Sequence, residues 1–374
     1  METCSIAGIM SLCNLAIRPR NLWCLIVRIL PKLLGLAPSL LKKFREDGHD
    51  HPPSVGTALG TLPELSQDIL MAIFATLEIP DLVRAGSVCS SWHTAYTILR
   101  DLGKYRLSQT PCLLYTSESS DDGIAFLYSL IEKRAYKLAL PEPPIRSRFL
   151  IGSSHGWLVT VDDRSEMHLI NPITGEQIAL PSVITIEHVK PIFNKSGAVE
   201  KYEYSRHTAT RVYHTPSIYA LGELRDYLQF KAFVFLETSK GSYIVVLIHG
   251  PYCQISFTRV GDAKWTWLPP HTDYEDCSYK DGILYAVTKV GEIYAFDING
   301  PVVTMNLIME MAQDAMCENM YIVQAPWGDL LNVWRDTNED RDSDSATLVR
   351  NTEEIKIYKV DTMAKKAHGN QWST

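Results

Sequence analysis

Residues 62–92 read LPELSQDILMAIFATLEIPDLVRAGSVCSSW, and this segment sets the architecture of the first part of the chain. Its first half carries apolar side chains at offsets of 0, 4, 5, 8, 9 and 12, which form one stripe along a helix of 3.6 residues per turn. The side chains of this stripe are Leu65, Ile69, Leu70, Ile73, Phe74 and Leu77. The spacing therefore predicts an amphipathic helix.

Two further short helices are predicted after the first one. Asp81, which follows Pro80, is a good N-cap for the second helix. The third helix has its own apolar face at spacings of three and four, made by Val88, Cys89, Trp92 and Tyr96. Three short helices bury little surface by themselves, so we expect them either to pack on the following domain or to dock into a partner protein.

The order of residues in this segment resembles the F-box, whose pattern runs Leu-Pro-x-Glu/Asp, Ile-Leu, Leu-x-x-x-Asp-Leu and Val-Cys-x-x-Trp. One departure is that the acidic residue follows Pro63 directly. The resemblance implies binding to the Skp-type adaptor of an SCF ubiquitin ligase, and through it to a cullin scaffold. The residues implied to bind the adaptor are Leu62, Pro63, Leu65, Ile69, Leu70 and Val83. Those implied to form the F-box core are Ile73, Phe74, Leu77, Leu82, Val88, Cys89 and Trp92.

The segment before the F-box is basic and partly apolar. Residues 3–45 contain no Asp or Glu, and their apolar run is interrupted by Arg28, Pro31 and Lys32 before it reaches the roughly 20 residues of a membrane-spanning helix. We therefore expect no membrane span. Residues 1–58 are predicted to be a poorly ordered or amphipathic extension and linker, with a transit peptide or a membrane-surface helix as alternatives. The F-box is expected at 59–104.

From residue 111 onward, short apolar runs alternate with turns. Three of these runs close on the same dipeptide, at Leu140-Pro141, Leu180-Pro181 and Leu268-Pro269. Strand–turn–strand units that recur in this way indicate radial repetition, and at roughly 40–50 residues per blade residues 111–374 allow about five or six blades. The predicted fold is mostly β with an N-terminal α module, a three-helix F-box followed by a β-propeller-like domain. An irregular β-sandwich is the alternative for the second part.

Several short motifs in this region resemble the kelch-like β-propeller region, long catalogued as a domain of unknown function, that follows the F-box in a large plant family. They are Gly156-Trp157, Asn171-Pro172 with Thr174-Gly175, the run from Gly261 to Leu268 and the run from Tyr279 to Asp297. One departure concerns the end of the sequence. Residues 355–361 look like a blade strand, but a polar stretch follows where the family has closing strands, so an incomplete C-terminal blade is one expectation.

Charge and cysteine content argue against several classes of function. The chain has 36 Lys and Arg against 43 Asp and Glu, and a net charge of −7 without a basic stripe disfavours nucleic-acid binding. None of its eight Cys residues stands at C-x-x-C spacing, so no zinc site is expected. Asp340, Asp342 and Asp344 have the spacing of a calcium loop but lack its Gly and its bidentate Glu. We expect no metal, no cofactor, and reduced thiols in a cytoplasmic or nuclear protein, with organellar targeting by the basic N-terminus as an alternative.

Catalytic motifs were sought and none is supported. Ser154 and His155 are neighbours in sequence, but no Gly-x-Ser-x-Gly elbow is present. Asp273, Glu275 and Asp276 are interpreted as turn residues. The chain is therefore expected not to be an enzyme but a substrate receptor that joins a target protein to the ligase. The alternatives are an interaction or scaffold protein with an incomplete propeller, and a propeller enzyme with an incidental helical cap.

Overall fold

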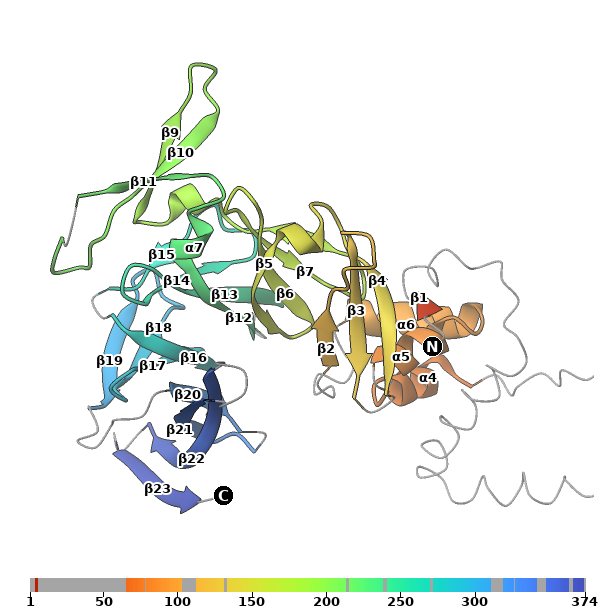
Figure 1. Ribbon diagram of the computed structural model, residues 1–374. Helices are drawn as coiled ribbons and strands as arrows, with labels where there is room; N and C mark the ends of the chain where they lie inside the picture. Colours follow the sequence, from red (N-terminus) through yellow and green to blue (C-terminus); the bar gives the residue numbers. More distant parts are fainter. Residues whose placement is uncertain are drawn as a thin grey trace, which may run out of the picture. The chain divides into compact units, whose positions relative to one another are not determined.

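A computed structural model describes most of the chain from Leu65 onward (Figure 1). The described residues are 4–5, 65–77, 79–102, 112–130, 133–212, 215–237, 241–269, 272–310, 319–325, 327–341, 348–362 and 366–372. They divide into two compact units, an N-terminal unit that ends at Ala139 and a C-terminal unit that begins at Leu140. The predicted extension at 1–58 therefore lies outside the described residues, apart from Cys4 and Ser5.

Three short helices open the N-terminal unit, as the apolar spacing predicts. They are α4 (Gln67–Phe74), α5 (Ile79–Gly86) and α6 (Ser90–Asp101). The prediction that Asp81 caps α5 is wrong, because the helix begins two residues earlier, at Ile79. Pro80 is tolerated there because the backbone N–H groups of a first turn have no partner within the helix. The Asp81 carboxylate instead accepts a 2.8 Å hydrogen bond from Arg84 in the next turn.

Aromatic contacts hold these helices together. The rings of Phe74 on α4 and Trp92 on α6 meet edge to face with their centroids 5.3 Å apart. At the end of α5, a Cβ atom added to Gly86 would lie 2.6 Å from the ring of Tyr96, so the close approach of α5 and α6 requires glycine at this position. The apolar stripes read from the sequence thus meet in one small core.

A sheet completes the N-terminal unit. Its antiparallel strands are β2 (Cys112–Tyr115), β3 (Ile124–Ser129) and β4 (Arg134–Ala139), and the two-residue strand β1 (Cys4–Ser5) pairs with β4 in parallel. The Arg84 guanidinium donates a hydrogen bond to the hydroxyl of Tyr136 on β4 and lies 5.3 Å from its ring centroid. The first sheet and the helices therefore belong to one compact unit.

The C-terminal unit consists of antiparallel sheets that follow one another along the chain (Figure 1). The first has strands β5 (Phe149–Ser154), β6 (Trp157–Val161), β7 (Met167–Ile170) and β8 (Gln177–Ala179). The second is a three-stranded insertion of β9 (Val189–Phe193), β10 (Val199–Tyr204) and β11 (Ser217–Ala220). A single helical turn, α7 (Arg225–Leu228), leads out of this insertion.

Three four-stranded sheets complete the C-terminal unit. The first has β12 (Gln229–Glu237), β13 (Ser242–His249), β14 (Gln254–Arg259) and β15 (Thr266–Trp267). The next has β16 (Tyr274–Lys280), β17 (Ile283–Thr288), β18 (Ile293–Asp297) and β19 (Thr304–Met309). The last has β20 (Asn319–Gln324), β21 (Leu330–Arg341), β22 (Leu348–Asp361) and β23 (Lys366–Trp372). The polar stretch after Asp361 thus supplies a fourth strand to the last sheet.

Neighbouring sheets of the C-terminal unit pack face to face through separate apolar clusters, in the manner of propeller blades. The strand β5 lies directly against β12, and a Cβ atom added to Gly152 would collide with the backbone carbonyl of Ala232. The Leu-Pro dipeptides have a common role as well. Their leucines follow the strands β4, β8 and β15, and all three are buried, namely Leu140, Leu180 and Leu268. The mostly β, propeller-like fold read from the sequence is confirmed.

The structure bears on the expectations about a membrane span and about the calcium-loop spacing at Asp340, Asp342 and Asp344. No helix within the part of the chain that the structure describes is long and apolar enough to cross a membrane. Asp340 lies in the long strand β21, while Asp342 and Asp344 lie outside the described residues.

Candidate functional site

The residues implied to bind an adaptor differ in their exposure to solvent. Leu62 and Pro63 lie outside the described residues, and Leu65 is half-buried just before α4. Ile69 exposes 50% of its surface on α4, whereas Leu70 exposes 1%. Val83 on α5 is buried too. Leu65 and Ile69 are therefore placed to form an apolar surface, and Leu70 and Val83 support it from within.

The residues implied to form the F-box core are mostly inside. Four of them are buried, namely Ile73, Phe74, Leu77 and Leu82, and two are half-buried, namely Val88 and Trp92. Cys89 has an exposed side chain, because it precedes α6 as its N-cap residue with an extended backbone of φ −158°. Ala95 and Leu99, which the sequence analysis passed over, complete the buried face of α6.

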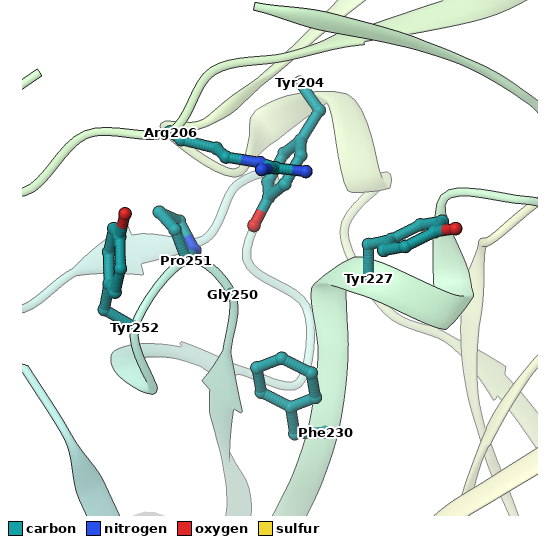
Figure 2. A pocket seen from close by; sticks show the side chains of 7 residues that line it. All are labelled: Tyr204, Arg206, Tyr227, Phe230, Gly250, Pro251 and Tyr252. Atoms are coloured by element: carbon teal, nitrogen blue, oxygen red, sulfur yellow. The ribbon is translucent and has the colours of Figure 1, made fainter. Parts of the chain in front are cut away.

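A second candidate site is an aromatic pocket of about 240 Å³ in the C-terminal unit (Figure 2). Its walls come from four places: the end of β10, α7, the start of β12 and the turn after β13. The lining residues are Tyr204, Arg206, Tyr227, Phe230, Gly250, Pro251 and Tyr252. Figure 2 shows the Tyr204 hydroxyl directed toward Gly250, with the Phe230 ring on the opposite side from the Tyr204 backbone. The pocket therefore has aromatic walls around a buried phenol.

Hydrogen bonds to one turn of the preceding sheet hold this pocket in place. The Tyr202 hydroxyl donates a 3.0 Å hydrogen bond to the Arg164 carbonyl, which lies in the hairpin turn between β6 and β7. The Ser165 hydroxyl donates a 2.5 Å bond to the Leu221 carbonyl, and the Gln229 amide donates a 3.1 Å bond to the Ser165 carbonyl. Two segments of the insertion, at Tyr202 and Leu221, and the start of β12 are thus fastened to a single hairpin.

The turn at Gly250 brings the pocket walls close together. A Cβ atom at this position would collide with the Tyr204 hydroxyl and the Tyr227 carbonyl, so only glycine fits. Tyr252 and Cys253 then adopt φ values of 59° and 47°, which non-glycine residues adopt rarely. Their carbonyls accept bonds of 2.8 Å from the Asp273 N–H and 3.0 Å from the Tyr274 N–H, which hold this backbone in its unusual conformation.

The electrostatics of the pocket are set by one cation. Among the described residues that line it, Arg206 alone carries a full charge. Its guanidinium donates a 3.2 Å bond to the Tyr219 hydroxyl, and the Tyr219 ring stacks on that of Tyr227 at 4.6 Å. Burial raises the pKa of Tyr204 well above its usual range, and the nearby Arg206 charge opposes this effect in part. The pocket is therefore apolar in its walls and positive at one side.

A buried histidine cluster lies near this pocket in the chain. His249, directly before Gly250, donates from Nδ1 to the Gly250 carbonyl at 2.6 Å and accepts at Nε2 from Ser256 at 2.8 Å. The centroid of the His188 ring lies 4.4 Å from that of the tilted His207 ring, and His188 Nε2 donates to the His207 carbonyl at 3.0 Å. Burial lowers the pKa of His188 to about 3 and that of His249 to about 4. The rings of His188 and His249 are therefore neutral structural groups at physiological pH.

No group of His, Cys, Asp and Glu within the described ranges has the geometry to hold a metal ion. Ser154 ends β5, and His155 occupies a left-handed position in the tight turn before β6, so the hydroxyl and imidazole singled out in the sequence are parts of a hairpin. Glu275 and Asp276 lie in β16, so their interpretation as turn residues is wrong. They alternate across the strand, and Asp276 points into the fold.

Comparison with known families decides how these units are classified. A family model described as the KIB1-4 beta-propeller matches residues 127–374, which is well over half of the chain. The chain belongs to the KIB1-4 β-propeller family. An F-box-like family model matches residues 62–98, which include α4, α5 and most of α6. This KIB1-4 protein is thus a plant-type F-box protein with a propeller, and the kelch-like motifs stay a prediction.

Curated relatives of this KIB1-4 protein come from Arabidopsis thaliana. F-box protein At5g25290 is 27% identical over 227 residues, which are 60% of this chain and 52% of the relative. F-box protein KIB4 is 24% identical over 245 residues, which are 64% of this chain and 60% of the relative. The chain thus matches between half and three fifths of the length of these relatives. Among solved structures, one chain from a study of two prolyl endopeptidases covers 71% of this chain and 50% of its own length, with 13% identity and a TM-score of 0.27.

The pocket lies entirely in the KIB1-4 β-propeller region, yet no sequence pattern predicts it. Its side chains come from positions 204 to 252, and no fixed spacing connects them. A signal is visible in retrospect, because tyrosines are frequent between residues 202 and 227. Frequent tyrosines alone, however, do not tell a pocket wall from a sheet core.

Proposed function

We propose that this KIB1-4 β-propeller protein is the substrate-receptor subunit of an SCF-type ubiquitin ligase. Its F-box binds a Skp-type adaptor and through it a cullin scaffold, and its C-terminal unit binds a target protein. The observation that carries this proposal is the F-box-like match at 62–98 followed by the propeller match at 127–374. The chain contributes proximity between target and ligase and no bond chemistry of its own.

The adaptor-binding surface in this proposal centres on Ile69. Half of this side chain is exposed on α4, next to the half-buried Leu65. An exposed apolar side chain on an amphipathic helix is the anchor that a partner's groove accepts. Leu62 and Pro63, which precede α4 in the chain, are proposed to extend this surface.

The test is co-purification of the chain with a Skp-type adaptor. Ile69→Glu is expected to lower adaptor recovery at least about tenfold, because a buried, unpaired carboxylate at an interface costs more than 1.4 kcal/mol. Ile98→Glu is the matched control, since Ile98 is also exposed, at 36%, but lies on α6. Equal recovery of wild type and Ile69→Glu would rule out this surface. An adaptor-bound chain that never changes the level of any protein would favour a scaffold role instead.

We further propose that the protein works in the cytoplasm or the nucleus. Among the described residues, Cys89, Cys253 and Cys277 are free thiols. Free thiols that are scattered through the fold are typical of a reducing compartment. Imaging of a fluorescent fusion tests this proposal, and accumulation in an organelle would contradict it.

A further inference from the structure

We propose that the aromatic pocket binds an extended peptide segment of the target protein, which inserts one apolar side chain and presents a carboxylate to Arg206. That the segment belongs to a target protein rests on the proposed receptor role. The chemistry of the ligand is inferred from the pocket residues alone. Its apolar walls, its single cation and its fixed backbone each restrict the ligand.

The walls of the pocket select an apolar side chain. Tyr227 and Phe230 each expose 48% of their surface, and Tyr252 exposes 38%. Large aromatic rings that gather at one exposed place mark a binding surface. Their rings also present rigid faces, which cost little conformational entropy when a ligand binds.

The size of the pocket favours a side chain of a peptide over a small molecule. Its volume of about 240 Å³ is below the roughly 300–1,000 Å³ of pockets that enclose drug-sized ligands. A leucine or proline side chain fits into such a space, and the flanking backbone remains on the surface. Aromatic-lined recesses of this kind accept extended, proline-containing peptides elsewhere.

The charge of the pocket selects an anion beside that apolar group. Arg206 uses one nitrogen for the Tyr219 hydroxyl, and no carboxylate of the described chain lies within ion-pair distance of its guanidinium. Guanidinium groups bind carboxylates through paired, charge-assisted hydrogen bonds. A cationic ligand would find aromatic faces here, but it would also meet the Arg206 charge, so a lysine or methylated lysine is disfavoured.

The backbone around the pocket is held in its binding geometry before any ligand arrives. Gly250 lets the Tyr204 hydroxyl and the Tyr227 carbonyl each approach the turn more closely than a larger residue would allow, and Tyr252 is held at a φ of 59°. Unusual backbone conformations that the surrounding structure maintains are concentrated at ligand-binding sites. A recess that needs no rearrangement loses less affinity to ordering on binding.

The experiment measures binding of fluorescent peptides to the purified full chain by anisotropy. The probes are acetylated and amidated peptides of about ten residues with a central Leu or Pro and with Glu, Gln or Lys two positions away. We expect the Glu peptides to bind about tenfold more tightly than the Gln peptides, because a charge-assisted hydrogen bond contributes more than a neutral one. The Lys peptides are expected to bind most weakly. A preference for Lys would overturn the proposal, and so would equal affinity for Glu and Gln if a free C-terminal carboxylate gives no tighter binding either.

A second arm distinguishes the two sources of a carboxylate. Peptides without Asp or Glu, but with a free C-terminal carboxylate next to the Leu or Pro, replace the amidated probes. Tighter binding of these than of their amides would assign the carboxylate to a chain terminus, and tighter binding of the Glu peptides would assign it to a side chain. Both results support the chemistry, whereas absence of binding in both arms contradicts it.

Variants connect the binding to individual residues. Arg206→Gln is expected to remove the preference for Glu over Gln, and Phe230→Ala is expected to weaken both probes alike. Arg211→Gln is the matched control, since Arg211 is exposed and does not line the pocket. Tyr227→Ala replaces Phe230→Ala if that variant unfolds at a lower temperature than wild type. An unchanged Glu preference in Arg206→Gln would disprove the role of the cation.

Failure of this proposal can be told apart from failure of the receptor role. The peptide assay contains no adaptor, so Ile69→Glu is expected to bind the probes as wild type does. The Arg206→Gln variant is conversely expected to co-purify with the adaptor. A wild-type chain that binds the peptides but does not co-purify with the adaptor would therefore refute the ligase role alone.

Discussion

Lys231 Nζ and Asp276 Oδ1 lie 2.7 Å apart and join β12 of one sheet to β16 of the next. The other oxygen of the Asp276 carboxylate, Oδ2, accepts a 3.0 Å hydrogen bond from the backbone N–H of Ile322 on β20. One side chain therefore connects three successive sheets. Only 7% of the Asp276 side chain is exposed, and burial raises its pKa while the Lys231 charge opposes this effect.

Loss of this carboxylate is expected to loosen the C-terminal unit. Asp276→Ala leaves the buried Ile322 N–H without its acceptor, which costs about 2 kcal/mol of unfolding free energy. The control is Glu203→Gln, which removes an exposed ion pair with Lys190 and is expected to change stability by less than about 1 kcal/mol. Urea unfolding measures both. Equal midpoints for the two variants would show that the three-sheet connection is unimportant.

Close contact between β5 and β12 predicts intolerance of any side chain at Gly152. Its Cβ atom would overlap the Ala232 carbonyl, so Gly152→Ala forces the two strands apart and is expected to cost about 1–3 kcal/mol. Gly300→Ala is the matched control, because the nearest atom to its added Cβ is the Val302 carbonyl oxygen at 3.4 Å. Thermal unfolding measures the difference. A Gly152→Ala protein as stable as Gly300→Ala would contradict the strand packing.

The buried histidines predict that stability falls in mild acid. Burial lowers the pKa of His188 to about 3 and of His249 to about 4, so below the ordinary value of 6.5 the unfolded chain binds protons that the folded chain does not. The stability contributed by each neutral ring is complete above about pH 6.5 and is lost at up to about 1.4 kcal/mol per pH unit as the pH falls toward its folded pKa. Urea unfolding at pH 7.5, 6.5 and 5.5 follows this loss.

A variant separates this effect from that of the carboxylates. His249→Gln removes one titrating ring, so its stability is expected to depend less steeply on pH between 6.5 and 5 than that of wild type. If the two slopes are equal, His249 is not the group that takes up the proton. The comparison is made between slopes because the substitution also changes stability at neutral pH.

Substitutions at two adjacent positions on α4 are predicted to affect different properties, stability at Leu70 and adaptor binding at Ile69. Leu70 is fully buried, so Leu70→Ala leaves a cavity and is expected to cost about 2–5 kcal/mol of unfolding free energy. Ile69→Ala removes a half-exposed side chain and is expected to cost less than about 1 kcal/mol while it weakens adaptor binding. Thermal unfolding and adaptor co-purification are measured on both variants. Similar stabilities would mean that α4 presents a different face to the core.

The helices could be predicted because their information is local. The stripe from Leu65 to Leu77 fits one helical face, and Leu70, Ile73 and Phe74 lie on its buried side. The beginning of α5 could not be placed as well, because Asp81 is a favourable N-cap residue whereas Pro80 is typical of a first helical turn, and the two signals place the start at different residues. The burial of Leu70 and Val83 could not be predicted either, because an apolar stripe does not show which of its side chains face the core and which stay exposed.

The sequence predicted repeating β-strand units, but it did not predict how all of the strands pair into sheets. The Leu-Pro dipeptides at Leu140, Leu180 and Leu268 indicated the ends of strand units, and all three leucines are buried directly after a strand. The three-stranded insertion and the polar strand β23 have no comparable local sequence pattern, so neither was predicted. A polar stretch becomes a strand when a neighbour offers its backbone, here β22, and this depends on pairing across the sheet rather than on the side chains of the stretch.

The amino-acid order by itself determined the F-box pattern and the β-rich, repetitive second part, because helical and strand periodicities are written in neighbouring residues. Only the tertiary structure decided that Asp276 joins three sheets, and that Tyr204, Arg206, Phe230 and Tyr252 meet around one recess. These residues come from different strands and turns, and their meeting depends on how the insertion is fastened to the hairpin at Ser165 and on the space left at Gly250. Such long-range contacts have no periodicity in the sequence, so only the folded chain reveals them.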